Sequence, residues 1–439
     1  MKVLVHKMSI RPRWIALILV ALALASLTCA GRQTVPAGTA VDAVSLVSRL
    51  EALPGVEVEA IEPDSGYAGA WEIFVEQPLD HNDPGAGTFR QRLILSHRGE
   101  DRPVVMITEG YSIGHNYIAG LAAILDANEL RVEHRYFGKS RPDSLDWRYL
   151  TIDQSANDHH SIAEMFGAIY QGKWVSSGWS KGGQTALVFR SRYPDDVAAT
   201  VAYDTPLNLA LEEPRIDAFF EAVGDSACRA RLVGFQRLAL ERKDTVLPLF
   251  EWYTKGKGYE YSVGLEKAFE YIVLEYPFSF WQYTDADCEA IPGEQATPDE
   301  VLEHLRDVVS FWSYSEKAMN SASMYQFCTQ LGYYGFITRN VDDLLSDTEY
   351  PNCAYAPRVG TEYDPEPMRS LDSWLKISGD NIIYIYGADD PWSAPFVDTS
   401  SKSNARTYFL DGGNHFTFIE TFPATKRDEI VGLLRGWLE

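Results

Sequence analysis

Apolar and polar positions divide the chain into strand-rich ends and a helix-rich middle. Continuous apolar runs occupy 103–108, 197–203 and 381–386, which is typical of strands buried on both faces of a sheet. Helical patterns stand between such runs, for example at 155–170. Strands that alternate with helices in this way predict an α/β fold with a largely parallel sheet.

A hairpin is predicted ahead of the parallel strands. The runs 71–75 and 88–96 have strand character, and the turn-rich residues 80–87 join them as an antiparallel pair. This hairpin makes the predicted sheet mixed. The chain closes on an amphipathic helix after Pro423, whose apolar positions recur on one face from Ile430 onward.

The middle of the chain lacks buried-strand patterns. Helical and aromatic-rich stretches such as 266–276 and 297–312 dominate there. We interpret this region as a mainly helical cap inserted into an α/β domain. In chain order, the predicted segments are a signal peptide at 1–30, a tether at 31–45, the first part of the α/β domain at 46–205, the cap at 206–371 and the second part of the domain at 372–439.

The amino terminus has the layout of a secretory signal peptide. Basic residues up to Arg13 precede the apolar run 14–25, and small residues follow it. Cys29 lies where a bacterial lipoprotein signal would place its acylated cysteine, and cleavage after Ala30 is the competing interpretation. Both predict export, to a secreted, periplasmic or lipid-anchored location. Membrane attachment is expected only through a lipid on Cys29.

Export changes how the remaining cysteines are interpreted. Four cysteines follow the predicted signal peptide, an even number that permits two disulfides in an oxidising compartment. Three pairings are open. None of the four has the spacing of a zinc site, and we expect no metal and no other cofactor. These cysteines are Cys228, Cys288, Cys328 and Cys353.

The net charge of the chain indicates which kinds of molecule it can bind. The chain has 439 residues and a formal net charge of -23, which argues against nucleic acids or anionic membranes as partners because both require a basic face. An acidic protein is compatible with a cationic partner such as the amino terminus of a peptide, although solubility alone explains the same charge.

The chemistry centres on Gly178-Trp179-Ser180-Lys181-Gly182. An apolar run at 173–177 precedes this motif and a helical pattern at 184–191 follows it. Strand, glycine-flanked serine and helix together form the nucleophile elbow, in which a tight turn exposes the serine hydroxyl. We therefore predict that Ser180 is a nucleophile.

Two later motifs supply an acid and a base. The strand at 381–386 leads into Asp389 and Asp390, and the strand at 405–410 leads to His415. In α/β-hydrolases the catalytic groups follow the order serine, acid, histidine along the chain, with acid and base on loops after late strands. We expect His415 to accept the serine proton and Asp390 to orient the imidazole, with Asp389 as the alternative acid.

The oxyanion hole needs two backbone N–H groups. One is expected from Lys181, which follows the nucleophile, and the other from Tyr111, on the loop after an early strand. A Ser-Lys dyad is the alternative role for Lys181, and it is disfavoured because a lysine at the start of the helix points away from the serine.

Three motifs together resemble one peptidase family. They are the stretch 133–142 (Glu-His-Arg-Tyr-Phe-Gly-Lys-Ser-Arg-Pro), the elbow at 178–183 and Asp390-Pro391-Trp392. From about Trp71 to its end the chain resembles the secreted prolyl tri/tetrapeptidyl aminopeptidases, and more distantly the lysosomal Pro-X carboxypeptidase and dipeptidyl-peptidase II family. This resemblance implies an α/β-hydrolase that releases short peptides from a free amino terminus, with proline before the scissile bond.

Such a substrate needs an apolar slot for proline and carboxylates for its ammonium group. Aromatic side chains are candidate walls of the slot, unless they only pack the core. Three glutamates are candidate ammonium ligands, unless they form structural ion pairs. Gln330 stands where the distant family is expected to carry a glutamate. The aromatic candidates are Tyr111, Trp179, Tyr333 and Trp392, and the acidic ones are Glu109, Glu133 and Glu316.

Alternatives remain open at this stage. A Pro-specific carboxypeptidase or dipeptidyl peptidase shares the expected site, and an esterase shares the fold. A catalytically silent surface binding protein is a further alternative, which the complete set of Ser180, Asp390 and His415 disfavours.

Overall fold

A mixed β-sheet organises the molecule. The computed structural model describes residues 45–354, 356–357, 362–399 and 404–439, so the predicted signal peptide and Cys29 lie outside the described residues. In this part of the chain nine strands follow the order β1-β2-β3-β5-β4-β6-β7-β8-β9. The strands are β1 (Val56–Ile61), β2 (Gly69–Pro78), β3 (Thr88–His97), β4 (Val104–Thr108), β5 (Asn128–Val132), β6 (Trp174–Trp179), β7 (Ala199–Tyr203), β8 (Ile382–Gly387) and β9 (Ala405–Leu410).

The sheet is parallel from β5 to β9 and antiparallel at its other end. The pairs β5–β4, β4–β6, β6–β7, β7–β8 and β8–β9 are parallel, whereas β1–β2, β2–β3 and β3–β5 are antiparallel. The predicted hairpin is β2–β3. The prediction of a mixed, mostly parallel sheet is therefore confirmed, and β1 adds an edge strand that the apolar pattern did not indicate.

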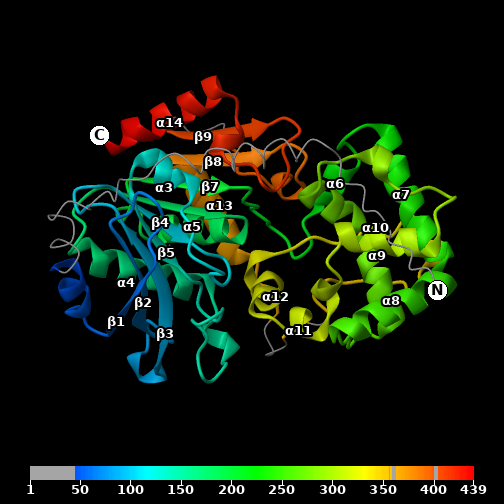
Figure 1. Ribbon diagram of the computed structural model, residues 1–439, viewed down its shortest axis with the longest axis horizontal. Helices are drawn as coiled ribbons and strands as arrows, with labels where there is room; N and C mark the ends of the chain where they lie inside the picture. The colour runs from blue at the N-terminus through cyan, green and yellow to red at the C-terminus, as the bar shows by residue number, and fades with distance from the viewer. Residues whose placement is uncertain (1–44, 355, 358–361, 400–403) are drawn as a thin grey trace, which may run out of the picture. The chain divides into compact units, whose positions relative to one another are not determined.

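Helices cover both faces of the sheet (Figure 1). On one face α4, α5 and α13 pack against alternate strand residues such as Met106 and Tyr384. On the other face α3 and α14 pack against Val105 and Ile383. Neighbouring strand residues point to opposite faces, so strands covered on both sides must be apolar throughout. These helices are α3 (Gly120–Leu125), α4 (Ile152–Gly167), α5 (Lys181–Arg192), α13 (Glu366–Ser378) and α14 (Ala424–Leu438).

A helix-rich segment lies between β7 and β8 and appears in green and yellow on the right of Figure 1. It has a core of its own, which includes Phe235, Phe250 and Tyr276. Disulfides join Cys228 to Cys288 and Cys328 to Cys353. Its helices are α6 (Pro214–Phe220), α7 (Ser226–Glu241), α8 (Lys243–Lys257), α9 (Leu265–Tyr283), α10 (Pro298–Val308), α11 (Glu316–Met319) and α12 (Ala322–Gln326).

The predicted cap boundary at residue 371 falls inside α13. Met368, Leu371 and Leu375 of this helix pack against α5 and β8 rather than against the helices of the insertion. By packing, α13 therefore belongs with the sheet. Its amphipathic pattern resembles that of the preceding helices, so the pattern alone did not separate it from them. No helix among the described residues combines the length and the apolar character that a bilayer crossing requires.

Candidate active site

Ser180 occupies a strained turn between β6 and α5. Its backbone has φ 57° and ψ -126°, a conformation that side chains other than glycine rarely adopt. The turn also needs small neighbours. A Cβ at Gly178 would collide with the backbone of Gly182, and one at Gly182 would lie 2.6 Å from the carbonyl oxygen of Thr108. This geometry has the features of a nucleophile elbow.

His415 and Asp390 lie on the loops that follow β9 and β8. The Nδ1 of His415 is 2.6 Å from Oδ2 of Asp390, and the residues are 1% and 0% exposed. Burial raises the pKa of Asp390, while the adjacent histidine opposes this shift. Asp389 points elsewhere, since it lines a separate cavity together with Asn414. The geometry therefore joins Asp390, rather than Asp389, to the histidine.

A third buried acid, Asp204, lies directly behind this pair. Its carboxylate accepts hydrogen bonds from the N–H groups of Gly387 and Thr417, which precede Asp390 and follow His415. Burial and the nearby charge of Asp390 raise the pKa of Asp204 well above its usual range. Asp204 thus ties together the two loops that hold the acid and the base. Sequence reasoning missed it, although an acid directly after the buried strand β7 was an available signal.

The side chain of Lys181 holds the loop after β4. Its Nζ donates to the carbonyl oxygen of Gly110 at 2.6 Å and lies 5.4 Å and 5.0 Å from the ring centres of Tyr111 and Phe137. The residue is 2% exposed, and burial lowers the pKa of its amine well below the usual range. Lys181 therefore bonds to the loop that carries the predicted second oxyanion donor.

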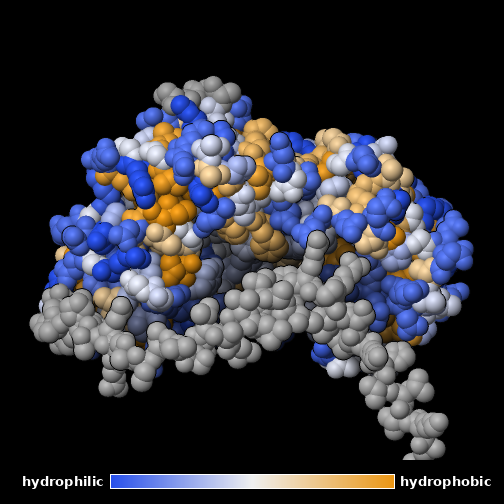
Figure 2. Space-filling model, turned by 45° about the horizontal axis from the view of Figure 1, so that its top comes forward, coloured by the Kyte–Doolittle hydropathy of each residue, from blue (hydrophilic) through white to orange (hydrophobic). Residues whose placement is uncertain are grey.

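One cavity of about 640 Å³ contains Ser180, His415 and Lys181. It also contains the four aromatic residues predicted to bind substrate, namely Tyr111, Trp179, Tyr333 and Trp392. The remainder of its lining comes largely from the helical insertion. Figure 2 shows a hollow between the sheet part and the helical part of residues 46–439. A second cavity of about 1150 Å³, which shares Tyr111 and Tyr333, contains Glu316.

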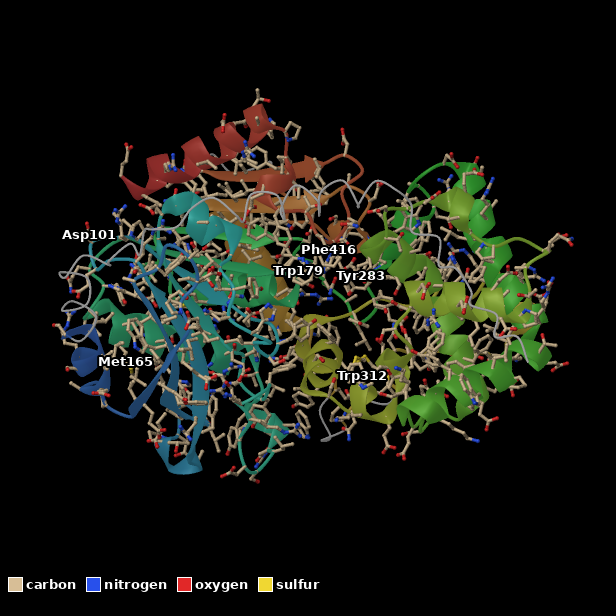
Figure 3. The ribbon with its side chains drawn as sticks, in the orientation of Figure 1. Asp101, Met165, Trp179, Tyr283, Trp312 and Phe416 are labelled. Atoms are coloured by element: carbon tan, nitrogen blue, oxygen red, sulfur yellow. A yellow bond between two sulfur atoms is a disulfide. The ribbon has the colours of Figure 1, made fainter. Side chains whose placement is uncertain are left out.

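Aromatic rings surround the histidine on the open side of the site. Trp179 donates its indole N–H to the carbonyl oxygen of His415 at 2.6 Å and stacks on Phe416 with ring centres 5.5 Å apart. The ring centres of Tyr283 and Phe416 lie 6.0 Å apart. Figure 3 shows Trp179, Tyr283 and Phe416 close together where the sheet part meets the helices.

Two of the predicted ammonium ligands have other partners. Glu109 pairs with Arg131 at 2.5 Å. Glu133 is fully buried and accepts hydrogen bonds from the backbone N–H groups of Ile113 and Ser140. Neither is among the residues that line the two cavities of the site. Both carboxylates therefore organise the loops after β4 and β5, as the alternative of a structural role predicted. Gln330 accepts a hydrogen bond from the N–H of Ile152 and is likewise not part of the cavity lining.

A glutamate that sequence reasoning missed lies inside the catalytic cavity. Glu275, in the middle of α9, accepts hydrogen bonds from the hydroxyls of Tyr314, Tyr334 and Ser279. It is 8% exposed, and burial raises its pKa to about 7. The available signal was a lone acid within the apolar run 271–280.

Comparison with known proteins identifies the family. The model of the PS-10 peptidase S37 family matches residues 39–421. This chain belongs to that family. It is a serine peptidase with an α/β-hydrolase fold.

The similarity to individual proteins differs in extent. The chain is 34% identical over 404 residues to a prolyl tri/tetrapeptidyl aminopeptidase of Streptomyces mobaraensis, with 89% of this chain and 84% of that protein covered. It is 26% identical over 188 residues to the lysosomal Pro-X carboxypeptidase of Mus musculus, with 38% of each chain covered. Among solved structures, a proline iminopeptidase of Mycobacterium smegmatis aligns with a TM-score of 0.44 and 12% identity, covering 83% of this chain and 98% of that one.

In this S37 peptidase we expect Lys181→Met to lower kcat by about 10- to 100-fold with little change in KM. The variant keeps the aliphatic stem but releases Gly110, and small displacements of a catalytic group have effects of this size. Steady-state kinetics on a peptide nitroanilide will measure both constants. Lys426→Met, an identical substitution on the exposed face of α14, is the control. An unchanged kcat would contradict a positioning role for the Lys181 amine.

The raised pKa of Glu275 predicts that the stability of the folded chain depends on pH. Between pH 4.5 and about 7 the unfolded chain releases the Glu275 proton while the folded chain keeps it. The free energy of unfolding therefore decreases as the pH rises through this range. The loss reaches about 3 kcal/mol above pH 7 and is absent below pH 4.5. Glu275→Gln does not ionise, so its melting temperature should exceed that of the wild type by a few degrees at pH 8 and by less at pH 5. Equal differences at both pH values would contradict the raised pKa.

Proposed function

We propose that this S37 peptidase is an exported exopeptidase. It releases tri- or tetrapeptides from the free amino terminus of oligopeptides, with proline before the scissile bond. The observation that carries the proposal is the enclosure of Ser180 and His415 in one aromatic-walled cavity beneath the helical insertion. Its volume of about 640 Å³ suits a short peptide and excludes a folded protein. The name of the Streptomyces relative supports the same activity.

The proposed reaction begins at Ser180. Its Oγ attacks the carbonyl carbon of the scissile bond while the free Nε2 of His415 accepts the serine proton. The Nδ1–H of His415 donates to Asp390, which stabilises the imidazolium that forms. The backbone N–H groups of Lys181 and Tyr111 donate to the new oxyanion.

Collapse of the tetrahedral intermediate breaks the carbon–nitrogen bond. His415 gives its proton to the leaving amine, and the released amino-terminal portion remains as an ester on Ser180. Water then attacks this ester with His415 as the base, which frees the short peptide and restores the serine. The rings of Trp179, Tyr333 and Trp392 offer apolar walls for proline, whose rigid ring suits such a slot.

The decisive experiment is mass spectrometry of the products from a set of proline-containing peptides, each with a free or an acetylated amino terminus. We expect tri- or tetrapeptide products from the free peptides and no cleavage of the acetylated ones. Retained cleavage of acetylated peptides, or removal of residues from the carboxyl end, would contradict the proposal. Fast hydrolysis of short acyl esters without peptide turnover would indicate an esterase instead.

Export is part of the same proposal. The two disulfides are of a kind that persists in oxidising compartments. Expression of the full chain in a bacterial host, followed by amino-terminal sequencing of the exported protein, tests this point. A product that begins at Cys29 and carries a lipid would support the lipoprotein alternative, whereas an uncleaved chain in the cytoplasm would contradict export.

A further inference from the structure

Glu275 is a buried carboxylate that forms no ion pair with any described residue. Its Oε2 accepts hydrogen bonds from both Tyr314 and Tyr334, and its Oε1 accepts one from Ser279 at 3.0 Å. Among the described residues no lysine, arginine or histidine forms an ion pair with it, and none contributes to the shift of its pKa. A carboxylate offers about four acceptor positions, so these three donors leave Oε1 with capacity for another.

Burying a carboxylate without a cation is unfavourable, which is why its pKa rises to about 7. A group of this kind inside a catalytic cavity is a candidate for ligand binding, because a bound cation would supply the missing partner.

The other acids near the site lack this property. Asp307 lines the same cavity, but it is largely exposed and pairs with Arg306 at 2.8 Å. Asp390 holds His415, and Glu316 lies in the neighbouring cavity. Of the carboxylates that line the cavity of Ser180 in the described chain, Glu275 alone is both buried and unpaired with a cation.

A second side chain in the cavity also has an acceptor that no hydrogen-bond donor occupies. The side-chain oxygen of Asn208 is buried without a hydrogen-bond partner, while its amide nitrogen donates to the carbonyl oxygen of Gly332 at 3.1 Å. Unused acceptors on Glu275 and Asn208 within one enclosed space favour a ligand rich in N–H donors. An ammonium group followed by peptide N–H groups has this character.

We propose that Glu275 binds the α-ammonium group of the substrate and thereby sets the length of the peptide released. This assignment rests on the proposed aminopeptidase function. With the ammonium held at Glu275, the carbonyl that reaches Ser180 must belong to a residue at a set number of positions along the chain, since an extended peptide advances about 3.3–3.6 Å per residue. Tyr314 and Tyr334 keep the carboxylate in place.

The test compares Glu275→Gln with the wild type on Ala-Ala-Pro-nitroanilide and on its N-acetyl derivative. Losing the charge should lower kcat/KM for the free amine by on the order of 10²–10³-fold, mainly through KM, and leave unchanged whatever residual hydrolysis of the acetylated substrate the wild type shows at high enzyme concentration. Asp307→Asn, which neutralises the other cavity carboxylate, is the matched control and should preserve the ratio of the two substrates. Labelling of Ser180 by a fluorophosphonate should proceed at the wild-type rate in both variants.

The outcomes separate this proposal from the preceding one. A wild type that cleaves both substrates equally well would contradict the aminopeptidase function itself. A wild type that requires the free amine, together with a Glu275→Gln variant that keeps this requirement, would overturn the role of Glu275 alone. Parallel loss of both substrates and of labelling would mean that Glu275 maintains the structure of the site, and this too would overturn the inference.

Discussion

Ser180→Ala should lower kcat on Ala-Ala-Pro-nitroanilide by on the order of 10⁵–10⁶-fold. Without the hydroxyl no ester forms, and the remaining groups can only help water to attack the substrate directly. Packing should change little because alanine removes only the hydroxyl oxygen and keeps the Cβ that the turn already accommodates. The measurement is a nitroanilide assay at high enzyme concentration, with covalent labelling by a fluorophosphonate as a second readout.

Ser177→Ala is the matched control for this substitution. Ser177 lies three residues earlier in β6, and its hydroxyl donates to the carbonyl oxygen of Val201 at 2.9 Å. Its loss should cost about 1 kcal/mol of stability and leave kcat and labelling unchanged. Labelling that persists in Ser180→Ala, or that disappears in Ser177→Ala, would show that the nucleophile is another residue.

The sheet was predictable because most of its strands are covered on both sides. Continuous apolar runs such as 103–108 and 381–386 identify β4 and β8 without knowledge of their neighbours. The apolar pattern did not indicate β1 because this strand lies at the edge of the sheet, where its residues are only partly buried or exposed. The predicted end of the insertion falls inside α13 because the amphipathic pattern of this helix indicates a buried face without indicating which element covers it.

The candidate site was predictable only where chemistry is encoded in consecutive residues. Glycines around Ser180 reveal the elbow, and the loops after two late strands reveal Asp390 and His415. By contrast, Glu275 and Asp204 acquire their character from burial and from distant partners such as Tyr314 and Gly387. The tyrosine hydroxyls that bind Glu275 are far from it in the sequence. The loop N–H groups that bind Asp204 are likewise far from it in the sequence.

The same distinction applies to Glu109 and Glu133, which have partners other than a substrate. Glu109 and Glu133 lie beside motif residues in the sequence, which suggested substrate binding. In space, Arg131 neutralises the first, and the backbone of Ile113 and Ser140 binds the second. A carboxylate whose charge is already compensated has little to gain from a substrate ammonium group.

Asp390→Asn should lower kcat by about 10⁴-fold. The carboxylate accepts the Nδ1–H of His415, so the ring presents its unprotonated Nε2 to Ser180. An asparagine amide can instead donate to Nδ1, which places the proton on Nε2 and prevents the ring from acting as a base. The loss should appear in kcat with little change in KM, and it is measured by steady-state kinetics.

Asp389→Asn provides the comparison that separates the two candidate acids. Asp389 is partly exposed and lines a cavity on the other side of the histidine loop, so its neutralisation should change kcat by less than about three-fold. A larger loss in Asp389→Asn than in Asp390→Asn would reverse the assignment of the acid.

Asp204 lies close enough to His415 to affect how the activity of Asp390→Asn is interpreted. The acidic oxygens of Asp204 and Asp390 and a ring nitrogen of His415 all lie within 4.8 Å of one another. Removing the Asp390 charge also removes the negative neighbour that, after burial, raises the pKa of Asp204. If Asp390→Asn retained activity within ten-fold of the wild type, Asp204 would be acting as the substitute acid. The double variant Asp204→Asn with Asp390→Asn should then lose the remaining activity. If the single variant falls by the expected 10⁴-fold, Asp204 serves to hold the loops through Gly387 and Thr417.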